Sequence, residues 1–470
     1  MNRLRASLVL EWTVEWRYRL PAVALVVTVV WTLALLAMPV SVARGAGPVI
    51  LTIDTATFGA FFIAALVLFE RDEGALAALT VSPLRFGEYL GAKVTCLTGL
   101  SVVSAVPIAL AAGVNLAMAL VGVALLAVLF LTLSFALVVR HRSLTGFLTI
   151  APLSLAPLIA APLAQLTGIA DHPLLYLVPT TAAAALISGV FEPAALAFLL
   201  LAVAAAIRLA RGRFTHESVG KERRSRQHRT RWRPRGWLAA LAGIDRRTSV
   251  RSALLMVVLA GPLLLVVAIR LGYPSLVAYL RDRFDIDITT YQPILLASLV
   301  VLHIPLITGM VGTLLVLDDI DNRTLLVIRV SPVTVRRYLA YRTVAVAAVA
   351  MLMLVIAVPV SGLAPRLALP ALVLAAAQAP LITLATTAFA SNKVEGLVWL
   401  KILGLLPTGI APAMWWLPDA AQWPLRVLPH YWTVDALWRL SPLGLLTGAG
   451  LTAIVAVGLT RRILRRFDAR

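Results

Sequence analysis

Two stretches of this sequence decide the fold: FERDEGALAALTVSPLRFGEYLGAKV from Phe69 to Val94, and DDIDNRTLLVIRVSPVTVRRYLAYRT from Asp318 to Thr343. Shifted by 249 residues, they align without a gap, and seven of the 25 positions from 70 to 94 are identical. The shared residues include a Ser-Pro pair that is followed six residues later by a Tyr-Leu pair. With one residue inserted, four helix-breaking residues downstream also reappear, at a shift of 250: Gly146, Pro157, Pro162 and Pro179 match Gly396, Pro407, Pro412 and Pro429. The chain is therefore predicted to contain two copies of one unit.

The composition places both copies in a membrane. Hydrophobic residues make up 60% of the 470 residues, charged residues only 14%, and the mean hydropathy is +0.92. A bilayer-spanning helix needs about 20 apolar residues. Runs of that kind recur at 21–38, 49–69, 94–112, 117–139, 146–167, 184–207, 252–271, 293–317, 343–363, 370–390, 396–413 and 440–460. We predict an all-α polytopic membrane protein with about 12 transmembrane helices, arranged as two parallel six-helix repeats.

The basic residues predict how the chain is oriented. Residues 208–251 hold 14 Lys and Arg against three acids, a large share of the net charge of +20. Cytoplasmic loops are enriched in Lys and Arg, so this segment and the other basic loops place both termini in the cytoplasm. A basic segment beside anionic headgroups indicates membrane lipids, and not nucleic acid, as its partner.

The same reading divides the chain into three regions of a multi-pass protein. Residues 1–210 are predicted to form the first six-helix unit, with an N-terminal interfacial helix. Residues 211–243 form a basic cytoplasmic linker, and residues 244–470 form the second six-helix unit. The strong preference for Arg over Lys is typical of a GC-rich bacterial genome, which indicates the bacterial cytoplasmic membrane as the location.

Two further features are expected at the membrane boundary. Within 7–19, Trp12 and Trp16 are four residues apart and share one face of an amphipathic helix suited to the interface. The regions 168–183 and 414–432 hold matching places before the last span of each copy, and Pro179 and Pro429 interrupt them at matched positions. The Trp-rich second region also fits an anchor at the water–lipid boundary, but the matched prolines favour a re-entrant pair of short helices in both copies.

The matched segments 70–93 and 319–342 fall on the cytoplasmic side of this topology. Each begins with acidic residues, continues through an apolar turn to the Ser-Pro pair, and ends in an amphipathic piece that leads into the next span. Proline suits the first turn of a helix and the preceding serine can cap it, so a short helix, a break and a second helix are predicted. From the pattern alone, such a loop either docks a partner or lies on the lipid surface.

The first matched segment resembles the signature of the type 2 ABC exporter permeases, which carry an acidic-Gly-Thr-Leu run, then a Pro, then a Gly-x-Lys. The residues that carry the resemblance are Glu70, Arg71, Asp72, Glu73 and Gly74, then Leu76, Ser82, Pro83, Gly91 and Lys93. More narrowly, the chain looks like the drug-exporter permeases of actinobacteria. The resemblance covers both copies. It implies that this loop is a coupling helix seated in a cleft of a separate ATPase subunit, and that the re-entrant pairs at 168–183 and 414–432 cap the exit path. In the second copy the corresponding residues are Asp319, Asp321, Arg323, Ser331 and Pro332.

The two copies depart from the family pattern in different ways. Ala75 stands where the family has Thr, and the second copy has Arg323 where the first has Gly74. The second loop is therefore expected to dock less tightly, or onto a different ATPase. Most family members are single six-span units that dimerise, whereas here one chain would supply both halves.

The sequence carries no signature of catalysis. It contains no GxxxxGK[ST] phosphate loop, no HExxH zinc motif and no GxSxG elbow. A single cysteine, Cys96, excludes a Cys-based metal cluster. The chain is therefore predicted to be no enzyme and to bind no metal or cofactor, and the resemblance implies that two copies of a separate ATPase subunit bind ATP and Mg.

Ionisable residues inside spans are functional suspects, and the predicted spans contain few. Asp54, near the outer end of the second span, and Lys401, one turn inside the eleventh, are predicted to line the substrate path. So sparse a set argues against a proton relay, which needs buried acids within reach of one another.

Three classes of function remain. The leading hypothesis is the permease component of an ATP-driven exporter that moves an amphipathic, drug-like or lipid-like substrate outward. Two parallel six-span repeats also fit a secondary transporter driven by an ion gradient. The third is a membrane scaffold that transports nothing. For the two transport hypotheses, the sequence does not identify the substrate.

Overall fold

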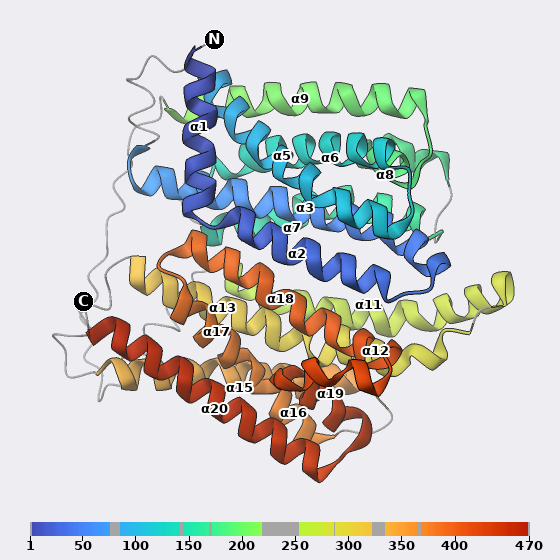
Figure 1. Ribbon diagram of the computed structural model, residues 1–470, viewed down its shortest axis with the longest axis vertical. Helices are drawn as coiled ribbons and strands as arrows, with labels where there is room; N and C mark the ends of the chain where they lie inside the picture. Colours follow the sequence, from blue (N-terminus) through green and yellow to red (C-terminus); the bar gives the residue numbers. More distant parts are fainter. Residues whose placement is uncertain are drawn as a thin grey trace. The chain divides into compact units, whose positions relative to one another are not determined.

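A computed structural model of the chain describes residues 2–75, 85–141, 144–168, 172–218, 253–285, 287–321, 334–364 and 368–468 (Figure 1). Over these residues the secondary structure consists of helices joined by short loops, and no strand is present. By the contacts between its Cα atoms, the chain divides into two compact units, Met1–Arg229 and Thr230–Arg470. The all-α class predicted from the apolar runs is confirmed.

Unit 1 begins with two helices that meet at a bend of 64°. The bend falls at Arg19, whose φ of 60° is left-handed, and Pro21 then lies in the first turn of the next helix, where its missing N–H costs nothing. The helices of unit 1 are α1 (Asn2–Arg17), α2 (Leu20–Leu36), α3 (Val40–Asp72), α5 (Phe86–Ala112), α6 (Leu116–Val138), α7 (Leu144–Leu166), η1 (Pro173–Leu177), α8 (Pro179–Ser188) and α9 (Pro193–Ser218).

Unit 2 repeats this order with more interruptions. Its helices are α11 (Ala253–Phe284), η2 (Thr289–Tyr291), α12 (Gln292–Leu295), η3 (Leu296–Val301), α13 (His303–Asp321), α15 (Val335–Ser361), α16 (Leu369–Ala376), α17 (Gln378–Phe389), α18 (Lys393–Trp416), η4 (Asp419–Ala421), η5 (Trp423–Val427), α19 (Pro429–Arg439) and α20 (Pro442–Asp468). The segment η3 is π-helical, and with α12 and α13 it forms one apolar span, Thr289–Asp321.

The predicted spans agree with these helices in all but one place. Ten helices among the described residues are long and apolar enough to cross a bilayer, or eleven if the bent α1–α2 pair is one span. The predicted run 184–207 is wrong at its start, because α8 ends at Gly189 with a left-handed φ of +91° and the span is α9, which begins at Pro193. The other predicted runs lie along single helices or consecutive helical segments.

Small residues bring the helices of unit 2 close together. A Cβ added to Gly309 of α13 would lie 2.6 Å from the carbonyl oxygen of Ala379 on α17, and one added to Gly312 would lie 2.6 Å from Oγ1 of Thr383. The Thr383 hydroxyl in turn donates to the Gly309 carbonyl at 3.0 Å. Without a hydrophobic driving force in lipid, such close packing and interhelical hydrogen bonds hold spans together.

A short helix precedes the last span in each unit, as the matched prolines predicted. α8 has 10 residues and α19 has 11, so each is about 15 Å long and reaches only half-way across the hydrocarbon layer. A role in capping the exit path stays a prediction. The linker limits at 211 and 243 also stay predictions, because α9 continues to Ser218 and residues 219–252 lie outside the described part of the chain.

Candidate functional site

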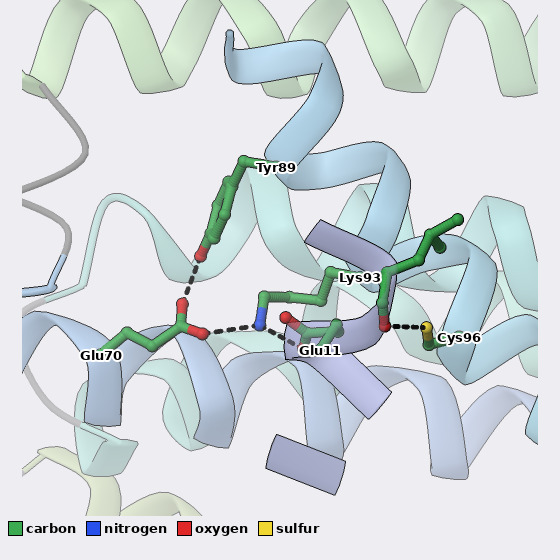
Figure 2. A network of polar contacts seen from close by, with 6 residues as sticks. Glu11, Glu70, Tyr89, Lys93 and Cys96 are labelled. Atoms are coloured by element: carbon green, nitrogen blue, oxygen red, sulfur yellow. Dashed lines mark hydrogen bonds and ion pairs between the residues drawn. The ribbon is translucent and has the colours of Figure 1, made fainter. Parts of the chain in front are cut away.

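Four side chains from three helices of unit 1 form one polar network (Figure 2). Lys93 of α5 places its Nζ 2.6 Å from Oε1 of Glu11 on α1 and 2.8 Å from Oε1 of Glu70 on α3. The second oxygen of Glu70 accepts a hydrogen bond of 2.5 Å from the hydroxyl of Tyr89. Tyr89 lies one turn before Lys93 on α5, so the two side chains share a face of that helix. The network therefore ties the N-terminal helix to the ends of two spans.

Burial makes this network energetically important. The side chain of Lys93 has no exposed surface, and those of Glu11 and Glu70 are 8% and 18% exposed. An ammonium group removed from water is tolerated only when it is paired and hydrogen-bonded. Two carboxylates on one lysine meet that condition, and they also mean that removal of Lys93 would leave two buried negative charges close together.

Glu15 adds a third acid beside this network. It lies one turn after Glu11 on α1, ahead of the first span, and it is fully buried. Neither carboxylate oxygen has a hydrogen-bond partner among the described residues. Burial first, and the negative charge of Glu11 second, raise the pKa of Glu15 to about 8. Glu15 is therefore mostly protonated at neutral pH, which spares the site an uncompensated buried charge.

A neighbouring face of α1 carries the two tryptophans singled out in the sequence. Trp12 and Trp16 are exposed, and their rings meet edge to face with centroids 6.1 Å apart. α1 thus turns its acids inward and its indoles outward. This is the arrangement expected of a helix that lies along the membrane interface.

The arrangement around Glu70 recurs in unit 2. Nη2 of Arg342 on α15 pairs with Oδ2 of Asp319 on α13 at 2.8 Å, and the hydroxyl of Tyr338 donates to the same oxygen at 2.5 Å. Arg342 also donates from Nε to the Tyr338 hydroxyl at 3.3 Å. Each of these residues stands 249 positions after its counterpart in unit 1. The repeat found in the sequence is therefore also a repeat of side-chain geometry.

α3 ends at Asp72, two residues after Glu70, and two residues fix this exit of the chain. Arg71 donates from Nη1 to the carbonyl oxygen of His141 at 2.5 Å and from Nη2 to that of Val139 at 2.8 Å. It thereby satisfies carbonyl groups at the C-terminal end of α6. Gly74 has a left-handed φ of +76°, and its N–H bonds to the carbonyl of Arg71 at 3.0 Å. A residue with a Cβ would be strained there. Glu73 lies exposed in the same turn.

The exit of α13 in unit 2 is held by a different contact. Nζ of Lys393, the first residue of α18, lies 2.5 Å from Oδ1 of Asp318 and 3.9 Å from Oδ2 of Asp321. The helix that precedes each matched loop is thus tied to another helix of its own unit, through Arg71 in one case and Lys393 in the other.

Several residues of the predicted coupling segments lie outside the described part of the chain. The described residues exclude Ser82, Pro83, Arg323, Ser331 and Pro332, and they exclude the side chain of Asp72. The structure brings Glu70 and Arg71 into contacts, places Glu73 and Gly74 at the surface turn, and places Asp319 and Asp321 at the end of α13. The coupling role of the whole set stays a prediction.

The two residues predicted for the substrate path lie in different surroundings. Asp54, on α3, lines a cavity of about 10 Å³ together with Ser101 and Ser104 of α5. That volume suits one water molecule and not an amphipathic cargo. Lys401 lies half-buried on α18. A transport role for either residue stays a prediction.

The residues predicted for the site do not include the basic and phenolic members of the networks. Tyr89 with Tyr338 and Lys93 with Arg342 were matched in the repeat, and the preserved opposite charge 23 residues after each acid could have identified them. Glu11 gave no such signal within the matched loops. The scarcity of acids that counted against a proton relay holds inside the predicted spans, whereas at the span ends Glu11 and Glu70 share one lysine.

Comparison with known proteins agrees with this two-part organisation. Residues 2–212 match the family model described as "Fluoroquinolones export permease protein family", and residues 245–464 match the one described as "Fluoroquinolones export permease protein Rv2686c-like". The chain is 34% identical over 200 residues to the fluoroquinolones export permease protein Rv2687c of Mycobacterium tuberculosis, which covers 42% of this chain and 84% of that protein. It is 30% identical over 241 residues to the fluoroquinolones export permease protein Rv2686c of the same organism, which covers 50% of this chain and 94% of that protein.

These matches confirm the resemblance to actinobacterial drug-exporter permeases of the ABC class that the loop motif indicated. They also fall on either side of the basic segment, so each half of the chain has a family model of its own. The chain therefore belongs to the fluoroquinolones export permease family, with two permease halves in one polypeptide.

Proposed function

We propose that this chain is the membrane-spanning part of an ATP-driven exporter and that two copies of a separate ATPase subunit dock on residues 70–93 and 319–342. The observation that carries the proposal is the pair of matched networks, Glu70 with Tyr89 and Lys93, and Asp319 with Tyr338 and Arg342. Each network lies where a matched loop leaves its span. Displacement of a loop moves a helix only when the joint between them is rigid, and hydrogen-bonded ion pairs supply that rigidity.

The partner, and not this chain, binds ATP and Mg in this proposal. The loops, both termini and the linker at 211–243 lie on the cytoplasmic side of a bacterial cell membrane, as the distribution of basic residues indicates. Closure of the ATPase pair rocks the two halves and moves an amphipathic, drug-like or lipid-like cargo outward. The names of the mycobacterial relatives favour a fluoroquinolone as the drug-like cargo to test first.

The decisive experiment measures ATPase stimulation by the full chain in vesicles with its candidate ATPase partner. Glu73→Lys reverses an exposed charge in the docking turn and leaves the buried network intact. The matched control is Glu192→Lys, which reverses an exposed acid between α8 and α9. We expect the first variant to lose stimulation and binding, the second to keep both, and both to melt like the wild type. If Glu73→Lys and Asp72→Lys both bind and stimulate normally, the coupling proposal fails.

One observation favours a second candidate, transport driven by an ion gradient. Glu11, Glu15 and Glu70 surround a single buried lysine, and such a cluster can exchange a proton when its geometry changes. Under this alternative, uptake into vesicles continues when ATP is removed and stops when the proton gradient is collapsed. The ATP-driven proposal expects the opposite pattern.

A further inference from the structure

Unit 2 contains an apolar groove that the proposed function does not use. Its volume is about 640 Å³, and α15, α16, α17 and α20 line it. The α20 residues that line it lie along one side of that helix: Leu445, Leu446, Ala449, Thr452, Ala453, Ala456 and Thr460. Pro370 lines the end near Leu445, and Thr343 of α15 lines the end near Thr460. α20 runs along the outside of unit 2 beside α16 and α17 (Figure 1).

The length and cross-section of the groove limit the kind of molecule that it can hold. The 15 steps from Leu445 to Thr460 correspond to about 22 Å along α20. That length equals one leaflet with its headgroups, about half of 40–45 Å. Spread over this length, the volume gives a mean cross-section of about 30 Å², too small to enclose an α-helix, whose diameter with its side chains is about 10–12 Å. A single hydrocarbon chain therefore fits the groove, and a partner helix does not.

The two ends of the groove differ in charge. At the Thr460 end, Arg461 and Arg465 of α20 are exposed, and Arg336 of α15 is exposed two turns before Thr343. At this same end, a buried cluster closes the groove. The cluster includes Leu339 of α15, Leu384 of α17 and Ile463 of α20. This end therefore presents cations beside an apolar slot, the combination that an anionic headgroup and its chain require.

The other two arginines near this end of α20, Arg462 and Arg466, make contacts within the protein. Arg462 donates to the carbonyl oxygen of Ala388, and Arg466 donates to those of Thr387 and Ala390, at the C-terminal end of α17. They hold α20 to α17 at the closed end of the groove. Arg461 and Arg465 lie on another face of the same helix and point to the surroundings.

The groove depends on small residues that unit 1 does not have. α9 and α20 both begin at a proline, Pro193 and Pro442, which sets their register at a shift of 249. In this register Leu200 stands where α20 has Ala449, and Ile207 stands where it has Ala456. Two large side chains of one copy are thus replaced by methyl groups along the groove of the other.

We propose that this groove is a binding site for an anionic phospholipid. One acyl chain lies between α15, α16, α17 and α20, and the headgroup phosphate pairs with Arg336 and Arg461, which are exposed near the Thr460 end. The lipid comes from the leaflet at the basic ends of the helices. In unit 1 the matching positions carry the larger side chains of Leu200 and Ile207.

The test uses the full chain in vesicles of equal parts phosphatidylethanolamine and phosphatidylglycerol, without any ATPase. Phosphatidylglycerol with a photoactivatable acyl chain is added, and the labelled peptides are identified by mass spectrometry. We expect adducts between residues 445 and 460. The double variant Ala449→Leu with Ala456→Ile, which installs the residues of unit 1, should lose them. Gly450→Leu is the matched control, because a side chain there meets nothing within 4 Å, and it should keep them.

A second arm replaces the probe by photoactivatable phosphatidylcholine, which carries no net charge. Arg461→Gln should lower phosphatidylglycerol labelling by about fivefold, the contribution of one arginine near an anionic surface, and leave phosphatidylcholine labelling unchanged. Equal labelling by the two lipids, or full labelling of the filled variant, would overturn the proposal. So would labelling of the groove by a photoactivatable fluoroquinolone that phosphatidylglycerol does not displace, since the groove would then be a cargo site. Since no ATPase is present, these results are independent of the coupling proposal.

Discussion

Substitution of Lys93 by methionine tests the energetic reading of the unit 1 network. Methionine has a similar length and no charge, so Lys93→Met leaves Glu11 and Glu70 buried without their partner. Both oxygens lay within 2.8 Å of the same nitrogen, so the two carboxylates are close neighbours. Breaking a buried pair by removing one member costs about 3–5 kcal/mol. We expect a loss of that size in the free energy of unfolding.

The matched substitution in unit 2 supplies an internal comparison. Arg342→Met leaves one carboxylate, Asp319, whose side chain is 21% exposed and can be rehydrated. The expected cost is about 1–3 kcal/mol, the range for one unsatisfied polar partner. Lys93→Arg keeps the charge that unit 2 uses naturally, so most of its stability should remain.

The measurement is unfolding of the full chain in mixed micelles with increasing dodecyl sulfate, followed by circular dichroism. A triple variant, Lys93→Met with Glu11→Gln and Glu70→Gln, removes every charge of the network and should recover most of the loss, because a neutral cluster carries no unpaired ion. The reasoning is refuted if Lys93→Met costs less than Arg342→Met, or if the triple variant is as unstable as the single one.

Three further predictions follow from local geometry. Gly74→Ala places a Cβ on a left-handed residue and should cost about 1 kcal/mol in the same assay; an unchanged midpoint would show that the turn is not fixed. Glu15 has a folded pKa of about 8 against an ordinary value of 4.5, so its contribution to stability is complete below pH 4.5 and is lost as the pH rises through 8. Between pH 5 and 9 the melting temperature of the wild type should fall more than that of Glu15→Gln. If the two melting temperatures change equally with pH, the raised pKa of Glu15 is wrong. Gly309→Ala drives a methyl group against the Ala379 carbonyl and should destabilise unit 2 by about 1–3 kcal/mol, whereas Gly45→Ala, with open space around it, should be neutral or slightly stabilising; equal midpoints for the two variants would disprove the close α13–α17 contact.

Most of the helical framework can be predicted from the sequence because the relevant signal is local. A run of apolar residues long enough for a bilayer can be read directly, and this placed α3, α5, α6 and α15 correctly. The prediction failed at 184–207, where the apolar run continues across Gly189 although the backbone turns there. Composition alone does not distinguish one span from a short helix followed by a span.

The networks could be predicted only in part, because they join residues that are distant along the chain. The repeat gave the positions of Glu70 and Lys93, but whether two side chains 23 residues apart meet depends on how α3 and α5 pack. Glu11 lies 82 residues before Lys93, and no spacing rule connects them. The groove is harder still, since Ala449 and Ala456 look like ordinary helix residues until the neighbouring helices are in place.

The long separation between Glu11 and Lys93 has a consequence for how the protein is made. Glu11 leaves the ribosome 82 residues before its partner, so α1 cannot be pinned by that ion pair while the first two spans are being inserted. During this interval α1 keeps its contacts with α2, and the exposed Trp12 and Trp16 hold it at the membrane surface. Once α5 is inserted, Lys93 pairs with Glu11 and fixes the position of α1. A tag or truncation that displaces the first turns of α1 is therefore expected to harm a late step of assembly, after the early spans are already in the membrane.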